Sequence, residues 1–286
     1  MLAEQQALAQ QTPAAVVADP PVDKKFPPGV LGITVPSHGV DMDATFYLAS
    51  GEAPHGTVLL LHGLPGYEHN GDLAQSIRRA GWNVLLFHYR GTWGTAGTFG
   101  LSSAIEDMAE AVRFLRDPVN TRKYRIEPQW LVVIGHSFGG FLAGYEGSHD
   151  PNIRATAMIA AVNLGKINAD PKERDARMKR WETQLHPVKG ATVSELFSEA
   201  ERHAKEWDYV RWADALRGRP VLLVEADDQN HDEMEALAAA LQKDSAALEH
   251  VVVATDHSFS DHRIELQMIV INWLERLKEN RRTDKH

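Results

Sequence analysis

The sequence predicts an α/β fold in which helices cover both faces of a mainly parallel sheet. Short and nearly continuous apolar runs alternate with stretches of helical periodicity along most of the chain. This alternation is typical of parallel strands joined by crossover helices. The chain has 286 residues and is 43% hydrophobic, so one large domain can bury a full core.

The predicted elements follow one another in a regular order from residue 31 onwards. Alternating apolar residues indicate a pair of opening strands at residues 32–37 and 43–50. The further strands are expected at residues 57–63, 83–91, 130–137, 153–162, 219–228 and 249–258. Helices are expected at residues 72–81, 103–116, 138–147, 232–243 and 263–280. The strands are apolar throughout, as strands buried on both faces should be.

Two segments depart from this alternation. Residues 1–30 are rich in Ala, Gln and Pro, and we expect a flexible or extended tail there, before a domain that spans residues 31–280. Residues from about 163 to 218 are polar and helical and contain no strand-like run. They predict a helical cap inserted over one edge of the sheet. The aromatic residues of this cap suit a structural cover and a substrate lid equally well.

The composition limits the classes of ligand that we expect, and one N-terminal stretch bears on where in the cell the protein is located. Basic residues number 30 and acidic residues 39, without a basic cluster, so we expect a small-molecule ligand and no nucleic acid. The absence of cysteine excludes disulfides, thiolate metal sites and a cysteine nucleophile. No apolar run approaches the roughly 20 residues of a membrane span. The small residues Ala7–Ala9 are similar to the end of an export signal, which leaves a periplasmic or secreted location open beside the cytoplasm. The oligomeric state is also left open.

The stretch "GHSFGG" at residues 135–140 places Ser137 between a predicted strand and a predicted helix. Glycines two positions before and after the serine allow a tight turn that lifts its hydroxyl clear of the sheet. The N–H groups at the start of the following helix can then face a negative charge on the substrate. We therefore interpret Ser137 as a nucleophile rather than as an incidental residue of a flexible loop.

A serine nucleophile needs a base and an acid, which follow it on later strand ends. His257 directly follows the last predicted strand and is preferred as the base to His262, at the start of the closing helix. The acid is expected after the strand at residues 219–228. Three candidates lie there, and Asp228 is preferred to Glu225 and Asp227 because its side chain can swing towards the histidine.

An oxyanion formed on the substrate requires two positioned donors. One is expected to be the N–H of Phe138, directly after the nucleophile. The second is expected from the glycine-rich turn after the strand at residues 57–63, where Leu64 exposes its N–H and Pro65 has none to donate. Tyr67 offers a hydroxyl near the same turn, although a packed surface tyrosine is the simpler interpretation.

Several motifs together resemble those of the α/β-hydrolase superfamily, over Leu31 to Lys278. They are "HGLPG" (62–66), "FHYRGTWGTAG" (87–97), "GHSFGG" (135–140), "ADD" (226–228) and "TDHSFSDHR" (255–263). Residues 89–97 and 106–116 are similar to bacterial hydrolases related to prolyl oligopeptidases and dienelactone hydrolases. The resemblance implies an eight-stranded sheet and no cofactor. It also implies a Ser-Asp-His triad of Ser137, Asp228 and His257, with structural roles for Arg90 and Asp107.

The leading hypothesis is a serine hydrolase that cleaves a carboxylic ester of a small or medium substrate through an acyl-enzyme. An amidase or aminopeptidase-like hydrolase would use the same triad and is the alternative. A non-catalytic ligand-binding protein with this fold ranks last, because every expected catalytic position is filled. No metal is expected, since "HNGD" (69–72) and "NHDE" (230–233) lack a recognisable ligand spacing.

Overall fold

The computed structural model describes residues 12–242 and 247–283. The strands are β1 (Gly29–Ser37), β2 (Val40–Leu48), β3 (His55–Leu61), β4 (Asn83–Phe87), β5 (Ile126–His136), β6 (Ala155–Ile159), β7 (Val221–Ala226) and β8 (Leu248–Val253). The α-helices are α2 (Ala14–Val17), α3 (Gly71–Arg79), α4 (Leu101–Arg116), α5 (Pro118–Tyr124), α6 (Phe138–His149), α7 (Pro171–Gln184), α8 (Val193–Arg202), α9 (Ala213–Leu216), α10 (His231–Gln242) and α11 (Arg263–Thr283). Two 3₁₀ turns are also present: η1 (Leu164–Lys166) between β6 and α7, and η2 (Tyr209–Trp212) between α8 and α9.

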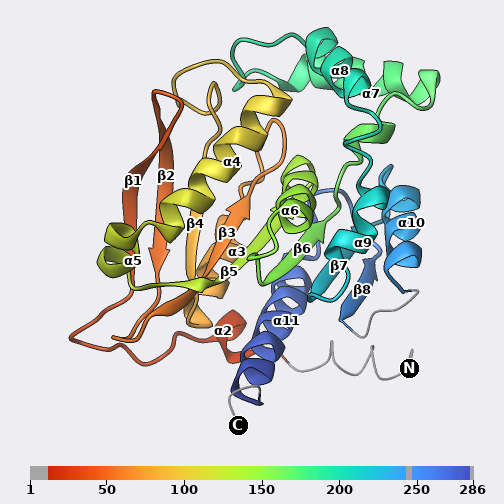
Figure 1. Ribbon diagram of the computed structural model, residues 1–286. Coiled ribbons are helices and arrows are strands. Elements are labelled where there is room, and N and C mark those ends of the chain that lie inside the picture. The colour runs from red at the N-terminus through yellow and green to blue at the C-terminus, as the bar shows by residue number, and fades with distance from the viewer. Residues whose placement is uncertain (1–11, 243–246, 284–286) are drawn as a thin grey trace.

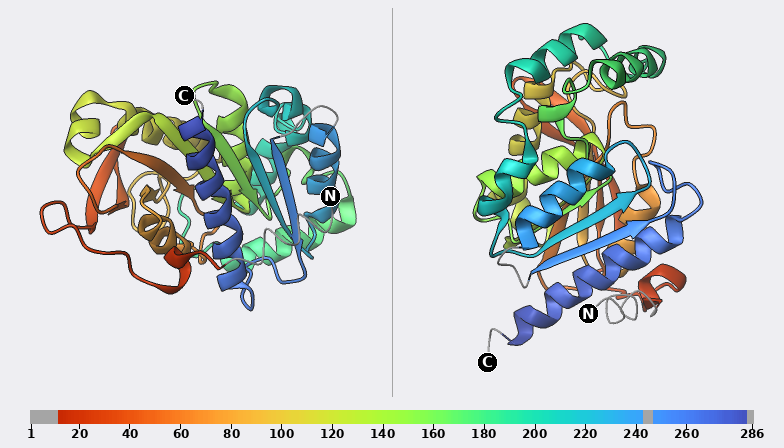
Figure 2. Two further views of the ribbon diagram at one scale, coloured as in Figure 1. Left: turned by 90° about the horizontal axis from the view of Figure 1, so that it is seen from below. Right: turned by 90° about the vertical axis from the view of Figure 1, so that its right-hand side faces the viewer.

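The strands form one sheet of eight in the order β1-β2-β4-β3-β5-β6-β7-β8 (Figure 1). β2 pairs antiparallel with β1 and with β4, and every later pair is parallel. The predicted fold class, an α/β fold with a mostly parallel eight-stranded sheet, is therefore confirmed. Figure 2 shows α11 on one face of the sheet and α6 and α10 on the other.

Alternate side chains of the central strands enter two separate cores. In β3, Leu59 and Leu61 face the core beneath α4, α6 and α10, whereas Val58 and Leu60 face the core beneath α3 and α11. All four are at most 1% exposed. Burial on both faces explains the continuous apolar runs in the sequence, since neither side of the strand meets water.

Two short helices lie where the sequence indicated no regular element. Within the expected tail, α2 buries Ala15, whose carbonyl oxygen accepts a hydrogen bond from Nε of Arg79 at 2.6 Å. After α4, the carboxylate of Asp117 accepts hydrogen bonds from the N–H groups of Val119 and Asn120 and begins α5, with Pro118 in the first turn. An aspartate followed by proline is a local helix-start signal, and it was overlooked in the strand-and-helix prediction.

The segment between β6 and β7 contains α7, α8 and α9 and no strand of the sheet. A β-bridge between Thr92 and Val188 joins it to the loop after β4, with further backbone hydrogen bonds from Trp93 to Pro187 and from Lys189 to Gly91. Figure 1 shows α7 and α8 at the opposite end of the molecule from the end of α11. Among residues 12–242 and 247–283, no helix is both long enough and apolar enough to cross a membrane.

The turn from β5 to α6 is unusually tightly packed. Ser137 has φ 59° and ψ −118°, a conformation that is costly for a residue with a side chain. A Cβ atom on Gly135 would lie 1.8 Å from the carbonyl oxygen of Gly139, and one on Gly139 would lie 2.1 Å from that of Leu61. The strand, the helix and the end of β3 therefore meet at distances that only glycine allows.

We expect Gly135→Ala to destabilise the protein by about 2 kcal/mol or more, because the added methyl group forces the turn apart. The measurement is urea unfolding followed by circular dichroism. The matched control is Gly32→Ala in β1, where a Cβ atom meets nothing within 4 Å. Equal stabilities for the two variants would contradict the close packing of the turn.

Candidate active site

Three side chains from three strand ends come together above the sheet. Ser137 follows β5, Asp228 follows β7 and His257 follows β8. Oγ of Ser137 lies 2.8 Å from Nε2 of His257, and Nδ1 of His257 forms a hydrogen bond with Oδ2 of Asp228. Because a carboxylate only accepts, Nδ1 carries the proton and Nε2 is free to accept the serine proton. The Asp228 side chain is 7% exposed, so water hardly competes for this contact.

The other acids after β7 lie in different surroundings. Asp227 is exposed to solvent. Glu225 is fully buried, and its carboxylate contacts Nδ1 of His231 at 2.6 Å and Nε2 of His250 at 2.5 Å. Of the three acids considered from the sequence, Asp228 is therefore the one that hydrogen-bonds to His257.

The second histidine considered from the sequence lies away from the serine. Nδ1 of His262 contacts Oδ1 of the exposed Asp261 at 2.8 Å. His262 directly precedes α11, and its N–H group donates to the carbonyl of Phe259 at the helix start. It therefore belongs to the start of the closing helix.

The side chain of His136 contacts the backbone of the loop after β8 that carries His257, here called the histidine loop. The sequence did not reveal this role. His136 is buried, and its Nε2 lies 2.7 Å from the carbonyl oxygen of His257. Burial, followed by the electrostatic effect of the neighbouring His257, lowers the pKa of His136 to about 3. A neutral imidazole here donates Nε2–H to the carbonyl and holds His257 in place without adding a competing charge. The unspecified position in a G-x-S-x-G motif carries no signal for this role.

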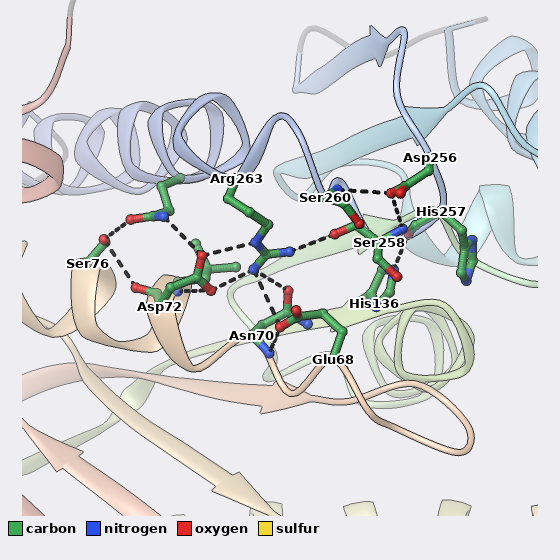
Figure 3. A network of polar contacts seen from close by, with 12 residues as sticks. Glu68, Asn70, Asp72, Ser76, His136, Asp256, His257, Ser258, Ser260 and Arg263 are labelled. Atoms are coloured by element: carbon green, nitrogen blue, oxygen red, sulfur yellow. Dashed lines mark hydrogen bonds and ion pairs between the residues drawn. The ribbon is translucent and has the colours of Figure 1, made fainter. Parts of the chain in front are cut away.

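Arg263 at the start of α11 links the histidine loop to the loop after β3 (Figure 3). Its guanidinium donates to the carbonyl of Ser258 at 3.0 Å, to Oδ1 of Asn70 at 3.0 Å and to the carboxylate of Asp72 at 2.6 and 3.0 Å. The Arg263 side chain is 19% exposed. A forked, partly buried contact of this kind fixes the distance between the two loops.

The two expected oxyanion donors lie beside the serine, one at the start of α6 and one in the loop after β3. Phe138 is the first residue of α6, and both Phe138 and Leu64 line the same cavity as Ser137. A Cβ atom on Gly63 would lie 3.1 Å from Cβ of Ser137, so the loop after β3 passes directly beside the nucleophile. The Leu64–Pro65 peptide bond is cis.

Three buried or half-buried histidines lie beneath this loop. His62 and His88 follow the ends of the paired strands β3 and β4, and His69 packs on both, with ring centroids 5.4 and 4.9 Å away. Burial lowers the pKa of His62 to about 3 and of His88 to about 4, aided in each case by a neighbouring histidine. Nδ1 of neutral His62 donates to the carbonyl of Gly63 at 2.7 Å. In the sequence, His62 and His88 each follow the end of one of two adjacent strands, and these matching positions are the signal that could have revealed the cluster.

The hydroxyl of Tyr67 connects the same loop to the cap. It donates to the carbonyl of Gln184 at the end of α7, at 3.3 Å, and its ring packs edge-on against Trp93, 5.2 Å away. The Tyr67 side chain is exposed and lines the cavity. Tyr67 is therefore a surface tyrosine that packs on Trp93, and it also lies at the cavity that contains Ser137.

A cavity of about 310 Å³ opens over Ser137 and His257. Trp181 and other residues of α7 form one wall, opposite the loop that carries Leu64. Trp181 packs edge-on against Phe197 of α8, with ring centroids 5.2 Å apart. Since small-molecule pockets are typically about 300–1,000 Å³, this cavity suits a small ligand enclosed partly by the cap.

In the described part of the chain, one group of side chains has donor atoms close enough to hold a metal ion. Donor atoms of Glu225, His231 and Glu235 lie within 4.8 Å of one another. Both carboxylate oxygens of Glu225 have partners, His231 and His250, and the imidazolium of His250 can balance its charge without a metal. We interpret this group as a buried ion-pair cluster that holds α10 and β8 to the end of β7.

Comparisons with known proteins agree with this fold. The model of the family described as "Alpha/beta hydrolase family" matches residues 58–266, more than half of the chain. The chain therefore belongs to the alpha/beta hydrolase family, and the resemblance predicted from its motifs is confirmed. A comparison with curated proteins found no match.

Several solved structures share the fold at low sequence identity. An esterase of Pyrococcus furiosus, Pf2001, is 18% identical with a TM-score of 0.63, covering 90% of this chain and 97% of that one. A bacterial brefeldin A esterase is 16% identical with a TM-score of 0.58, covering 97% and 80%. The alpha/beta hydrolase GrgF of Penicillium is 14% identical with a TM-score of 0.63, covering 89% and 99%. At these identities the similarity shows the fold alone.

The contact between Glu225 and His250 predicts a pH-dependent stability. The hydrogen bond to Glu225 raises the pKa of His250 above its usual 6.5. The stabilisation is complete below the unfolded pKa and is lost as the pH rises through the folded one. His250→Gln should therefore lower the free energy of unfolding by about 1.5–3 kcal/mol near pH 6 and by less near pH 9.

Urea unfolding at both pH values tests this expectation. The control is His262→Gln, because Asp261 also raises the pKa of His262, but that pair is exposed to water and should contribute less. A larger loss at alkaline than at acidic pH for His250→Gln would reverse the expected sign and refute this account of the cluster.

Proposed function

We propose that this protein is a serine hydrolase that cleaves carboxylic esters of small or medium size through an acyl-enzyme. The proposal rests mainly on one arrangement: Oγ of Ser137 lies 2.8 Å from Nε2 of His257, whose Nδ1 is hydrogen-bonded to Asp228. A serine hydroxyl is a weak nucleophile on its own, and this chain of contacts supplies the base that it needs.

In the first step, Oγ of Ser137 forms a bond to the carbonyl carbon of the ester while its proton moves to Nε2 of His257. The imidazolium that results is stabilised by the carboxylate of Asp228. The carbonyl π electrons move to the oxygen, which becomes the oxyanion of a tetrahedral intermediate. His136 keeps the backbone of His257 in position during this transfer, through its 2.7 Å contact with the His257 carbonyl.

The N–H groups of Phe138 and Leu64 are proposed as the donors to this oxyanion. Phe138 supplies an N–H at the first turn of α6, where helix N–H groups lack partners within the helix. For Leu64, the supporting observation is the hydrogen bond from His62 to the Gly63 carbonyl. The Gly63 carbonyl and the Leu64 N–H belong to the same trans peptide, the one before the cis Leu64–Pro65 bond. The two groups of a trans peptide point in opposite directions, so the Leu64 N–H points away from His62.

The intermediate then collapses and completes the reaction. The bond to the alcohol oxygen breaks, and the leaving group takes the proton from Nε2 of His257. A water molecule next gives a proton to the same nitrogen and attacks the acyl-enzyme, and the second tetrahedral intermediate releases the acid and returns the proton to Ser137. A cavity of about 310 Å³ accommodates substrates of small or medium size.

Replacing Ser137 should abolish catalysis without unfolding the protein. We expect the wild-type protein to hydrolyse 4-nitrophenyl acetate or butyrate and to be labelled at Ser137 by a fluorophosphonate. Ser137→Ala should lose about 10⁴-fold or more in kcat and should not be labelled. A wild-type protein that neither hydrolyses the esters nor reacts with the probe would refute the proposal. Rates on a 4-nitroanilide of the same acid measure its preference for esters over amides.

The acid of the triad is tested by two neighbouring substitutions. Asp228→Asn should lower kcat about 10³- to 10⁴-fold, because the amide no longer holds the imidazole in the required tautomer. The matched control, Asp227→Asn, alters an exposed carboxylate one position earlier and should leave kcat within about twofold. A larger loss for Asp227→Asn than for Asp228→Asn would assign the acid to Asp227.

A further inference from the structure

Helix α7 of the cap presents two guanidinium groups to the cavity that contains Ser137. Arg177 and Arg180 both line it, beside Trp181 of the same helix. The chain as a whole has a net charge of −9, so two adjacent cations over the nucleophile run against the overall charge. Because both guanidinium groups line the cavity, their charge favours binding of an anionic substrate there.

Arg177 is buried without a strong partner. It is 9% exposed, and within the described part of the chain its one hydrogen bond is a long one, from Nη1 to the carbonyl of Ile167 at 3.5 Å. A guanidinium has five N–H donors. Among the described residues, no carboxylate lies within ion-pair distance of it. Burial and then Arg180 lower the pKa of Arg177, while the weaker effects of Glu233, Glu173 and Asp228 act in the opposite direction.

Two other arginines that are largely shielded from water, Arg90 and Arg263, are paired with carboxylates. Arg90, with a side chain 13% exposed, contacts Asp107 at 2.5 Å and Glu106 at 2.6 Å. Arg263, 19% exposed, contacts Asp72 at 2.6 Å. Burying a cation without a counter-ion is costly, and the cost is offset when a ligand supplies the counter-ion. Arg177 thus has the donors and the position to receive an anionic group from the cavity.

Arg180 lies at the outer edge of the same wall. It is exposed, and its NH1 donates to Oε1 of Gln229 at 3.3 Å, next to Asp228. This contact ties α7 to the loop that carries the proposed catalytic acid. A substrate anion held by Arg177 would therefore be bound by an element anchored to the catalytic loop, which favours a fixed distance from Ser137.

We propose that Arg177, assisted by Arg180, binds a free carboxylate on the substrate, so that the preferred substrates are esters that carry a second, uncleaved carboxylate. This inference rests on the proposed esterase function. A carboxylate matches the planar fork of a guanidinium and carries one charge for one buried cation. Glu68 on the cavity wall disfavours a more highly charged group such as a phosphate.

The test compares three chromogenic esters that differ in charge. 4-Nitrophenyl hemiglutarate carries the carboxylate on the acyl side, 3-carboxy-4-nitrophenyl valerate carries it on the alcohol side, and 4-nitrophenyl valerate is neutral. We expect the wild-type protein to prefer at least one anionic ester to the neutral one by about 10- to 100-fold in kcat/KM. Arg177→Gln should remove this preference, mainly by raising KM, and should leave the rate on the neutral ester within a few-fold.

Two further variants separate recognition from folding. Arg177→Lys keeps the charge and most of the packing but loses the fork, so it should retain only part of the preference. Arg174→Gln is the matched control, since Arg174 lies on the same helix, pairs with the exposed Asp175 and is outside the cavity wall. It should behave as the wild-type protein does. Circular dichroism establishes that each variant is folded.

The possible failures are distinguishable. If the wild-type protein hydrolyses neutral and anionic esters equally well, the carboxylate site is refuted and the esterase function stands. If no ester is hydrolysed and the fluorophosphonate does not label Ser137, the esterase function is refuted. Calorimetric titration with monomethyl glutarate then decides the carboxylate site separately: binding lost in Arg177→Gln supports it, and no binding to the wild-type protein overturns it.

Discussion

The backbone conformation of Ser137 is the constraint on which the rest of the site depends. Its N–H group donates to the carbonyl of Ile159 on β6 at 2.8 Å, and its own carbonyl accepts from Gly140 at 3.0 Å and from Val162 at 3.2 Å. These bonds, together with the glycines that pack against one another at the turn, hold a positive φ at a residue that carries a side chain. The hydroxyl can then point only towards the strand ends, where the other groups must meet it.

The two loops that flank the serine are not independent of each other. Arg263 bonds to Ser258 in the histidine loop and to Asn70 and Asp72 at the end of the loop that carries Leu64. His136 fixes the backbone of His257 from below. The position of His257, the proposed base, is thus coupled to that of Leu64, a proposed oxyanion donor. The hydrogen bonds of Arg263 and His136 provide this coupling. Preorganised contacts of this kind avoid a rearrangement cost during the reaction.

The fold could be predicted from the sequence. The proximity of Ser137, His257 and Asp228 could also be predicted, because each follows a recognisable apolar strand. The supporting residues could not be predicted in the same way. The burial of His136 and the three-way contacts of Arg263 arise from chain segments that are distant in sequence, and no local pattern encodes them. The helix α5 is the opposite case, since Asp117 and Pro118 carried a local signal that strand and helix periodicity alone overlooked.

The division of labour between the sheet and the cap follows from where each group is anchored. Ser137, Asp228 and His257 stand at the ends of β5, β7 and β8 of one sheet, so their relative positions are set by the packing of that sheet. Arg177 and Trp181 stand on α7, and Trp181 packs into the same hydrophobic core that α6 covers. The hydrogen bonds of Tyr67 to Gln184 and of Arg180 to Gln229 add polar contacts between α7 and the strand-end loops. Substitutions on the cavity face of α7 can therefore alter which molecules enter the cavity, while the proposed triad keeps its anchors on the strand ends. Arg177 lies at the cavity, where a ligand of opposite charge would offset the cost of burying its guanidinium.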